Sequence, residues 1–371
     1  MKSIALFTIL LFFTSCEPWV DVFEGDIALE VIMFESSDIE ENTVADFDSL
    51  KVVSWNIRNG FGRFPWIYDS CGDSVISDES SIKNVLSKIA KKLDEIGADV
   101  VLLQEVDFLS KRSAYINQVQ YLLDNTSLNF GAYASMYKTD FAPSDGLGMV
   151  DGGNVVLSKY KLEDPQRIPL ALRTDQGSLE QYFYLRRNIL KVKIPELSQN
   201  GKDFYAVNVH ATAFATDDTK QKHIDKYIEI LNEINSSGNL FVSGGDLNSV
   251  PPGSEIDFCE ADRCEGEICD GDYKNNSAYY GTYFGHFEGE PDLLVPLYNN
   301  YTAAIDLEDA NLPFHFTHAK STSFETDSIK FDRKLDYLFT NSDWHNGQTH
   351  QESWILSDHT AVSATFKLTA E

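Results

Sequence analysis

The sequence predicts an α/β fold in which two β-sheets are covered by helices. Apolar runs of strand length alternate along the chain with segments that repeat apolar residues every three or four positions, as amphipathic helices do. Some neighbouring strands have no helix between them, and this combination favours two sheets over a single parallel sheet. The chain has 371 residues, of which 43% are hydrophobic, so it is long enough to bury a large core.

The helix predicted over residues 81–96 is the clearest element of the first half of the chain. Its apolar residues recur at spacings of three and four, and Gly97 provides an end signal. A strand at 51–55 precedes it, and a loop rich in glycine, proline and aromatic residues, 60–78, lies between the two. The elements expected next are a strand at 99–106, a helix at 114–123, and strands at 154–157 and 188–194.

A second amphipathic helix is predicted over residues 220–234, where Gly238 follows as a break. A strand at 204–209 precedes it, and a strand at 240–243 follows and leads into Gly244-Gly245-Asp246. Residues 252–300 have no clear periodicity and read as an irregular insertion beside the site. Strands at 335–340 and 361–368 are expected to close the fold.

The N-terminus has the pattern of an export signal rather than of a folded element. Lys2 is followed by an apolar stretch too short to span a membrane permanently, and then by Thr14-Ser15-Cys16. This pattern resembles a bacterial lipoprotein signal over residues 1–15. It predicts export and a lipid anchor on Cys16, which would hold the protein on a bacterial membrane in the periplasm or at the cell surface. An ordinary secretory signal cut nearby is the alternative.

Residues 16–46 are predicted to form an acidic tether, because acidic residues recur there and no lysine or arginine occurs from residue 3 to residue 50. The stretch from Ile27 to Phe34 is apolar enough to form a strand, so part of the tether is expected to dock on the body. The body itself is predicted to be one catalytic domain over residues 47–371.

Four cysteines remain after Cys16: Cys71, Cys259, Cys264 and Cys269. An even number in an oxidising compartment predicts up to two disulfides, for which three pairings are open. The spacing of the last three does not match the usual zinc-binding patterns.

Charge and motif content narrow the classes of function. The net charge of −28 argues against a protein that coats a polyanion by bulk attraction. Neither a P-loop nor a Rossmann glycine fingerprint occurs in the sequence, which weakens nucleotide-dependent activities.

Polar residues stand at the ends of several apolar runs. In a layered sheet the ends of neighbouring strands lie at one edge, so side chains at these positions lie close together. The eight candidate site residues are Asn56, Glu105, His210, Asp246, Asn248, Asp336, Asp358 and His359. Taken singly, several have ordinary structural explanations: Glu105 could cap a helix, residues 244–248 could be a turn, and His210 could be a core histidine. The ordered set favours a common site for a hard cation and a phosphate.

Carboxylates and an amide in this set suit a metal ion. Mg²⁺ prefers one or two carboxylates together with water and substrate oxygens, and Glu105 and Asp358 are the best candidates. Asn56 could add a neutral oxygen to the same ion. The expected cofactor is therefore Mg²⁺, with Mn²⁺ as a substitute.

The other five residues suit the hydrolysis of a phosphoester. Asp246, at the end of an apolar strand, is expected to act as the general base toward water. Asn248 and His210 are expected to hold the phosphate. His359 is expected to donate to the phosphate oxygens in the transition state, oriented by Asp336.

The ordered pieces resemble the endonuclease/exonuclease/phosphatase superfamily, the DNase I-like metal-dependent phosphoesterases. The pieces that carry the resemblance are Ser54-Trp55-Asn56, Gln104-Glu105-Val106, Asn208-Val209-His210, Gly245-Asp246-Leu247-Asn248, Asp336-Tyr337 and Ser357-Asp358-His359. The resemblance implies a four-layered α/β/β/α sandwich with a single catalytic domain. It also implies Glu105 as the main Mg²⁺ ligand, and for the other site residues the roles given above.

Three substrate hypotheses remain open. The acidic chain favours a small or lipid-linked phosphodiester, bound beside an aromatic rim at residues 279–287 and hydrolysed by a monomer. An extracellular DNase or RNase would instead need cations near the site, for which Lys111, Arg112, Arg186 and Arg187 are candidates. The third hypothesis is a non-catalytic surface lipoprotein that binds a partner. His318 has no role in any of them, since a long helix that would pair it with His315 is disfavoured by Pro313.

Overall fold

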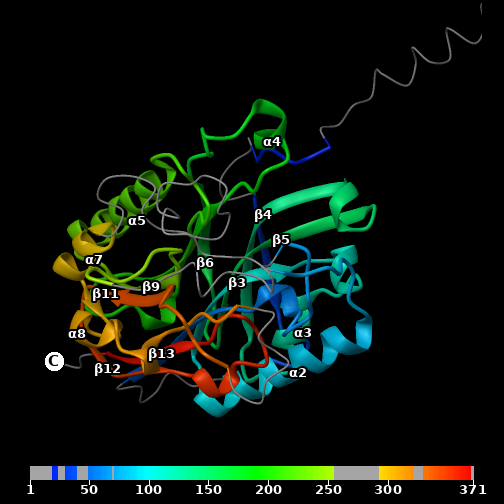
Figure 1. Cartoon of the computed structure of the whole chain (residues 1–371). Coiled ribbons are helices and arrows are strands. Elements are labelled where there is room, and N and C mark those ends of the chain that lie inside the picture. Colours follow the sequence, from blue (N-terminus) through cyan, green and yellow to red (C-terminus); the bar gives the residue numbers. More distant parts are fainter. Residues whose placement is uncertain are drawn as a thin grey trace, which may run out of the picture.

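The computed structural model describes residues 19–23, 30–39, 49–68, 71–254, 292–320 and 329–368. They form one domain built on two mixed sheets, which confirms the predicted fold class. One sheet has seven strands in the order β1-β4-β5-β3-β2-β13-β12, and the other has six in the order β10-β11-β9-β8-β7-β6. Figure 1 shows α2 and α3 on one outer side of the sheets and α5 and α7 on the opposite side.

The strands of the seven-stranded sheet are β1 (Val31–Glu35), β2 (Ser49–Asn56), β3 (Val100–Asp107), β4 (Phe130–Ala142), β5 (Gly148–Ser158), β12 (Trp344–Thr349) and β13 (Val362–Lys367). Those of the six-stranded sheet are β6 (Glu163–Pro169), β7 (Asn188–Lys193), β8 (Phe204–His210), β9 (Leu240–Asp246), β10 (Thr302–Ala303) and β11 (Asp336–Thr340). The α-helices are α2 (Glu79–Ile96), α3 (Gln118–Leu123), α4 (Ser178–Tyr182), α5 (Thr219–Ser236), α7 (Val295–Asn300) and α8 (Leu307–Ala310).

Three hydrophobic clusters correspond to the three interfaces of a four-layered sandwich. The first lies between the two sheets and joins Val52 and Leu102 to Leu190 and Ala206. The second packs the apolar face of α2 on the outer face of the seven-stranded sheet. The third packs α5 on the outer face of the six-stranded sheet. The apolar face of each amphipathic helix is therefore buried against the outer face of one sheet.

Helix α2 ends where the sequence predicts and begins two residues earlier, at Glu79. Its N-cap is Asp78, whose side chain accepts a hydrogen bond from the backbone N–H of Ser81. At the other end Gly97 adopts a left-handed conformation, with φ of 74°, and its N–H returns to the last turn. These two caps fix the length of the helix.

Parallel strand pairs bring the predicted site residues to one edge of the structure. Strand β2 runs parallel to β3, with Asn56 opposite Gln104, and β8 runs parallel to β9, with His210 opposite Asp246. Strand β11 runs the other way, so that its first residue, Asp336, also stands opposite Asp246. The ends of four strands and the beginning of a fifth thus meet at one rim.

Two glycines allow β9 to pass between its neighbours. A Cβ atom on Gly244 would lie 2.1 Å from the carbonyl oxygen of Tyr337, and one on Gly245 would lie 1.8 Å from that of Val209. Gly245 also has a φ of 143°, which other residues rarely adopt. The Gly-Gly pair before Asp246 is therefore a requirement of close strand packing, and it sets the position of the aspartate.

The sequence pattern did not predict β4, β6 and β12. Strand β4 contains several glycine, alanine and serine residues, β6 contains two prolines, and β12 is polar, so none has the apolar run expected of a strand. Strand β4 forms because it pairs along most of its length with β5 and also with β1. The predicted docking of the N-terminal segment is present as β1, although it lies at 31–35 rather than 27–34.

Several predictions fall on residues outside those described. These are the signal and lipid anchor at 1–16, most of the tether, most of the insertion and its aromatic stretch, and Cys259, Cys264 and Cys269. Cys71 is disulfide-bonded, and the other four cysteines all lie outside the described residues. Among the helices of the described segments, none has the length and apolar character needed to cross a membrane.

Candidate active site

A cleft of about 380 Å³ lies at the rim where the strand ends meet. Six of the eight predicted site residues line it: Glu105, His210, Asp246, Asn248, Asp358 and His359. The other two lie directly behind, because Asn56 donates to Glu105 and Asp246, and Asp336 contacts the His359 imidazole. The structure therefore brings together all eight residues.

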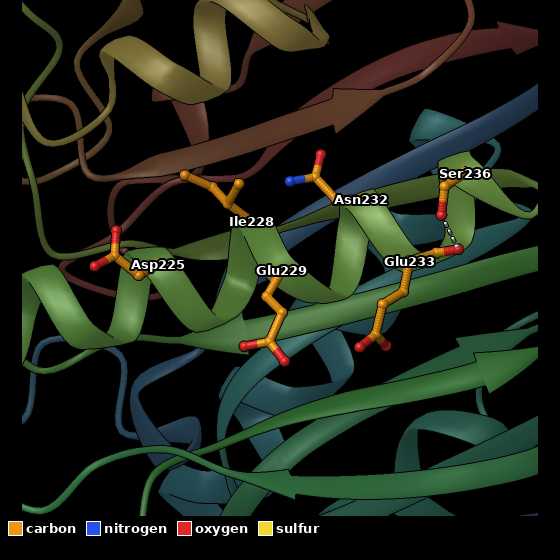
Figure 2. Close-up of a pocket in the computed structure, with 6 residues that line it drawn as sticks. All are labelled: Asp225, Ile228, Glu229, Asn232, Glu233 and Ser236. Atoms are coloured by element: carbon orange, nitrogen blue, oxygen red, sulfur yellow. Dashed lines mark hydrogen bonds between the residues drawn. The ribbon is translucent and has the colours of Figure 1, made fainter.

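A second hollow lies on the exposed face of α5 and contains none of the predicted residues. It is lined by Asp225, Ile228, Glu229, Asn232, Glu233 and Ser236, all from this one helix (Figure 2). Its polar side chains project from a single element and do not converge on a common point. The rim cleft is consequently the better candidate for a reaction site.

Glu105 reaches the cleft because β3 is irregular at this position. The pairing of β3 with β5 shifts between Leu103 and Val106, and Glu105 has a φ of 53°. Such a bulge redirects the side chain away from the regular alternation of the strand. The Asn56 amide nitrogen, 3.0 Å from Oε1, and the Asn59 amide nitrogen, 3.5 Å from Oε2, then hold the carboxylate in place.

Asn56 presents its amide nitrogen, not its oxygen, to these carboxylates. Its Oδ1 accepts the backbone N–H of Arg58 at 3.0 Å, and its Nδ2 lies 3.1 Å from Asp246 Oδ2. The hydrogen bonds thus link Glu105 with Asp246. The role of metal ligand for Asn56 stays a prediction.

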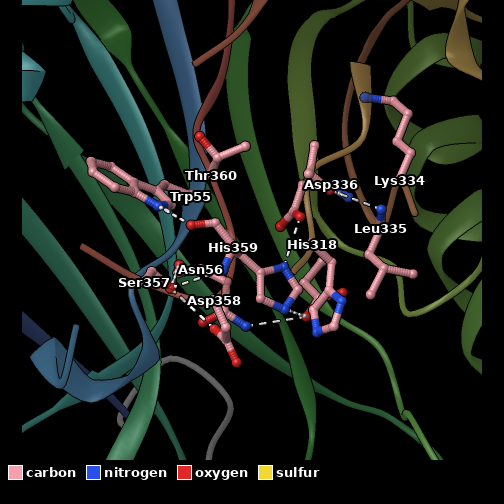
Figure 3. A network of polar contacts seen from close by, with 12 residues as sticks. Trp55, Asn56, His318, Lys334, Leu335, Asp336, Ser357, Asp358, His359 and Thr360 are labelled. Atoms are coloured by element: carbon pink, nitrogen blue, oxygen red, sulfur yellow. Dashed lines mark hydrogen bonds and ion pairs between the residues drawn. The ribbon is translucent and has the colours of Figure 1, made fainter. Parts of the chain in front are cut away.

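His359 and Asp336 form a buried imidazole–carboxylate pair, in which Nδ1 lies 2.8 Å from Asp336 Oδ2 (Figure 3). The backbone of His359 is also fixed, since its N–H donates to Ser357 Oγ and its carbonyl accepts the Trp55 indole N–H. Burial tends to lower the pKa of His359, but the carboxylates of Asp336 and Asp246 raise it well above 6.5. These carboxylates therefore favour the protonated imidazole, which has an N–H on Nε2 as well as on Nδ1.

Asp246 lies at the centre of the cluster. Its Oδ2 is 3.4 Å from His210 Nε2 and 3.8 Å from His359 Nε2. Burial and the neighbouring Asp336 carboxylate raise the pKa of Asp246 to about 6, while the His359 charge opposes this rise. A carboxylate with a pKa close to neutral is well matched to accepting a proton from water.

His210 is buried beside two of these carboxylates. Its Nε2 lies 3.9 Å from Glu105 Oε1, in addition to the contact with Asp246, and its Nδ1 has no hydrogen-bond partner among the described residues. Burial, followed by the charge of Arg187, lowers the pKa of His210 well below 6.5. A neutral imidazole that points at the carboxylates can donate one N–H without adding charge.

The acidic side chains of the cleft fit a divalent cation. Burial and the negative charge of Asp358 raise the pKa of Glu105, so the two carboxylates destabilise each other's charge. Among the described residues, two groups bring three possible ligand atoms within 4.8 Å of one another: Asp246 with Asp336 and His359, and His318 with Asp358 and His359. A cation held by Glu105 and Asp358 would relieve their repulsion, and carboxylate oxygens are ligands that suit Mg²⁺.

Asn248 follows Asp246 with a φ of 47°. Its backbone N–H donates to Asp246 Oδ1 at 2.9 Å, and its side-chain nitrogen donates to the Ala211 carbonyl at 3.1 Å. Asn208, two residues before His210, has a structural part instead: it donates to the carbonyls of Leu103 and Val155 and so ties the two sheets together.

Of the four cations considered for nucleic-acid binding, three are engaged within the protein. Lys111 donates to the Gly146 carbonyl, and Arg112 is paired with Asp107 at 2.8 Å and with Asp145 at 3.3 Å. Arg186 donates to the backbone carbonyls of 181, 182 and 184. Arg187 alone of the four lines the cleft without a carboxylate partner among the described residues.

Sequence reasoning missed His318 and Asp332, which form a second imidazole–carboxylate pair at the cleft, with His318 Nδ1 3.0 Å from Asp332 Oδ1. It also missed an aromatic wall formed by Trp66, Tyr68, Tyr137, Phe183, Tyr184 and Phe214. These aromatic residues come from four separate segments, so no local sequence pattern predicts that they line one cleft. The only signal for His318 is its place in Phe316-Thr317-His318 before the strand that carries Asp336.

Comparison with known proteins agrees with this geometry. The sequence model described as the Endonuclease/Exonuclease/phosphatase family matches residues 53–359. The endonuclease/exonuclease/phosphatase from Beutenbergia cavernae DSM 12333 has 17% sequence identity and a TM-score of 0.53, over 87% of this chain and 72% of its own. The one from Bacteroides vulgatus has 16% identity and a TM-score of 0.52, over 86% of this chain and 99% of its own. None of the curated proteins matches the chain.

Proposed function

Because the chain belongs to the endonuclease/exonuclease/phosphatase family and is therefore a metal-dependent phosphoesterase, we propose that its substrate is a small or lipid-linked phosphodiester. The aromatic wall of the cleft is the observation that carries this choice. Six aromatic side chains line the cleft, whereas three of the four candidate cations are engaged elsewhere. A nucleic acid would need free cations along its phosphates, and an apolar or small organic group needs only the aromatic surface.

Arg112 shows how this wall is built. Its guanidinium lies 4.9 Å from the Trp66 ring centroid, and Asp107 and Asp145 offset its charge. The Asp107 side chain is fully buried, which fixes the arginine in place. Arg112 is therefore better suited to supporting the Trp66 ring than to attracting a polyanion from solution.

Each side chain of the cleft has a separate role in hydrolysis. Asp246 accepts the proton of the attacking water, and His359, held by Asp336, donates Nε2–H to the oxygen on which negative charge develops. His210 and Asn248 position the phosphate. Glu105 and Asp358 would hold the divalent cation, which neutralises phosphate charge and polarises the phosphorus–oxygen bond.

We also propose that the protein is exported and anchored to a bacterial membrane through Cys16, and that it acts as a monomer. The signal-like pattern of residues 1–16 supports the export, and the disulfide at Cys71 is consistent with an oxidising compartment. Metabolic labelling with a palmitate analogue tests the anchor: wild type should carry the label, and Cys16→Ser should not.

A matched substrate panel tests the proposed activity. It contains sphingomyelin vesicles, a glycerophosphodiester, bis-p-nitrophenyl phosphate, inositol phosphates, RNA and supercoiled plasmid, each assayed with Mg²⁺ and then with EDTA. We expect cation-dependent turnover of a small or lipid-linked diester, and a loss of about 10³-fold in Glu105→Gln. Glu229→Gln, which alters an exposed carboxylate of α5, is the matched control and should leave the rate unchanged.

Two results of the panel would count against the proposal. Plasmid nicking or RNA cleavage faster than the turnover of every small or lipid diester would reject the substrate class. Absence of turnover across the panel by folded, cation-loaded protein would reject hydrolysis of these esters altogether.

A further inference from the structure

His318 is a cleft residue that the proposed mechanism does not use. The residue is 7% exposed, and its ring meets the His359 ring at a centroid distance of 5.2 Å and an angle of 76°. Figure 3 shows it beside the His359 imidazole. The two imidazoles are arranged alike, since each has its Nδ1 within hydrogen-bond distance of a buried aspartate.

Asp332 determines which nitrogen of His318 is available. The Arg333 Nε donates to Asp332 Oδ1 at 2.6 Å, and the same oxygen lies 3.0 Å from His318 Nδ1. A carboxylate held by an arginine accepts from Nδ1–H, so the lone pair of the neutral imidazole is on Nε2. A histidine that ligates a metal typically has this arrangement, in which a carboxylate orients the ring and increases its basicity.

The backbone holds His318 and Asp358 next to each other. His318 forms antiparallel bridges with both Arg333 and His359. The N–H of Ala319 donates to the Asp358 carbonyl at 2.9 Å, and the N–H of Thr360 donates to the Thr317 carbonyl at 2.8 Å. Both side chains therefore project from two short segments whose relative position is fixed by hydrogen bonds.

One nitrogen of His318 and one oxygen of Asp358 lie within 4.8 Å of each other, which is close enough to share an ion. We propose that His318 Nε2 and the Asp358 carboxylate bind the same divalent cation, so that this site prefers cations that accept nitrogen ligands, such as Mn²⁺, over Mg²⁺. The inference builds on the proposed function because it concerns the cation of the same cleft. Imidazole suits Mn²⁺, Co²⁺ and Zn²⁺, whereas Mg²⁺ favours oxygen ligands almost alone.

Asp358 keeps coordination capacity for this ion. Its Oδ2 lies 3.5 Å from Arg58 Nε, and its Oδ1 accepts from Ser357 Oγ at 3.2 Å. Each carboxylate oxygen has a second lone pair, so both can accept these partners and still face a cation. His359 is the weaker candidate for a ligand, because its Nε2 faces Asp246 and serves as the proton donor.

Pulsed electron paramagnetic resonance of the Mn²⁺-loaded full chain, without substrate, tests the proposal directly. Wild type should show ¹⁴N coupling from a directly bound imidazole, His318→Gln should lose it, and the exposed control His345→Gln should keep it. Titration should also show that His318→Gln weakens Mn²⁺ binding by about 10–100-fold and Mg²⁺ binding by less than about 3-fold.

Other outcomes of this experiment overturn the inference. They are the absence of ¹⁴N coupling in wild type, or coupling that persists in His318→Gln and disappears in His359→Gln. If His318→Gln does not fold, Asp332→Asn replaces it, and an unchanged ratio of Mn²⁺ to Mg²⁺ affinity then counts against the proposal. Since binding is measured without substrate, a failure here is separate from a failure of the ester panel.

Discussion

Asp246, which is buried, and Asp358, which is partly buried, are two aspartates of one cleft in opposite electrostatic surroundings. Asp246 faces another carboxylate, Asp336, across the β9–β11 pairing, and burial together with this neighbour raises its pKa to about 6. Burial also tends to raise the pKa of Asp358, but His359 and Arg58, whose Nε lies 3.5 Å away, reverse the effect and lower it. The pKa of an aspartate is thus raised at one position of the cleft and lowered at the other.

This difference shows how one site can supply both a base and an anion. A carboxylate with a raised pKa can take up a proton during the reaction, whereas one with a lowered pKa stays ionised and can hold a cation. Neighbouring charges decide which of the two states applies, because burial alone would raise both pKa values. Three predictions test this contrast.

The largest expected effect is that of Asp246→Asn. The rate should fall by about 10²–10⁴-fold, because the general base is lost. In the metal-free protein at pH 7, the free energy of unfolding should rise by up to about 3 kcal/mol. The folded pKa of Asp246 lies above its unfolded value, so ionisation of this group costs stability at pH 7, and asparagine removes the cost.

Asp358→Asn is the comparison for the stability measurement. Its pKa is lowered in the folded protein, so its ionised form contributes stability at neutral pH, and urea unfolding at pH 7 should show a loss. The contrast between the two aspartates would be refuted if both substitutions changed the unfolding free energy in the same direction.

Asp336→Asn should lower the pKa of Asp246 and so bring it closer to the pKa of Asp358. The substitution removes the anion that raises the pKa of both Asp246 and His359. We expect the rate to fall by about 10²–10³-fold because His359 loses the carboxylate that orients it, and the acid limb of the kcat/KM profile to move to lower pH because Asp246 loses a neighbouring anion. Asp306→Asn, at an exposed position, is the control. An acid limb that stays in place in Asp336→Asn would show that Asp336 does not set the pKa of the base.

His223 offers the smallest effect and shows what burial does where it outweighs the effect of the neighbouring carboxylate, Asp217. Its Nε2–H donates to the Ala171 carbonyl at 2.7 Å, its Nδ1 accepts from the Thr212 N–H, and burial lowers its pKa to about 4. In the unfolded chain His223 therefore becomes protonated below about pH 6.5, whereas in the folded protein it stays neutral down to about pH 4. Stability contributed by neutral His223 is present above pH 6.5 and is lost as the pH falls.

The difference in unfolding free energy between pH 7 and pH 5 should be about 2 kcal/mol larger in wild type than in His223→Gln. Urea unfolding of both proteins at the two pH values measures it. Equal pH dependence in the two proteins would mean that this burial does not lower the pKa.

Sequence periodicity predicted that these polar residues meet at one rim, because each lies at or near a strand end. Asp246 is an example, since the apolar run and the Gly-Gly pair before it already indicate a strand that ends at a carboxylate. Strands β4 and β12 were missed because pairing with neighbouring strands, rather than their own composition, makes them strands.

The charge states could not be predicted from sequence for a related reason. The raised pKa of Asp246 depends in part on its register with Asp336, ninety positions along the chain. The lowered pKa of Asp358 depends on His359, the next residue, and also on Arg58, three hundred positions away. His318 was likewise hidden, since its partner Asp332 becomes adjacent only through an isolated bridge to Arg333.

Carboxyl ¹³C NMR of the metal-free protein, titrated from pH 3 to pH 8, tests the central claim most directly. Asp246→Asn and Asp358→Asn assign the two resonances. The account predicts that the Asp246 carboxyl titrates near pH 6, while the Asp358 carboxyl is still ionised at the usual aspartate pKa of about 3.9. Two carboxyls that titrate together near pH 4, or an Asp358 that titrates at the higher pH, would contradict the division of the site into a base and a permanent anion.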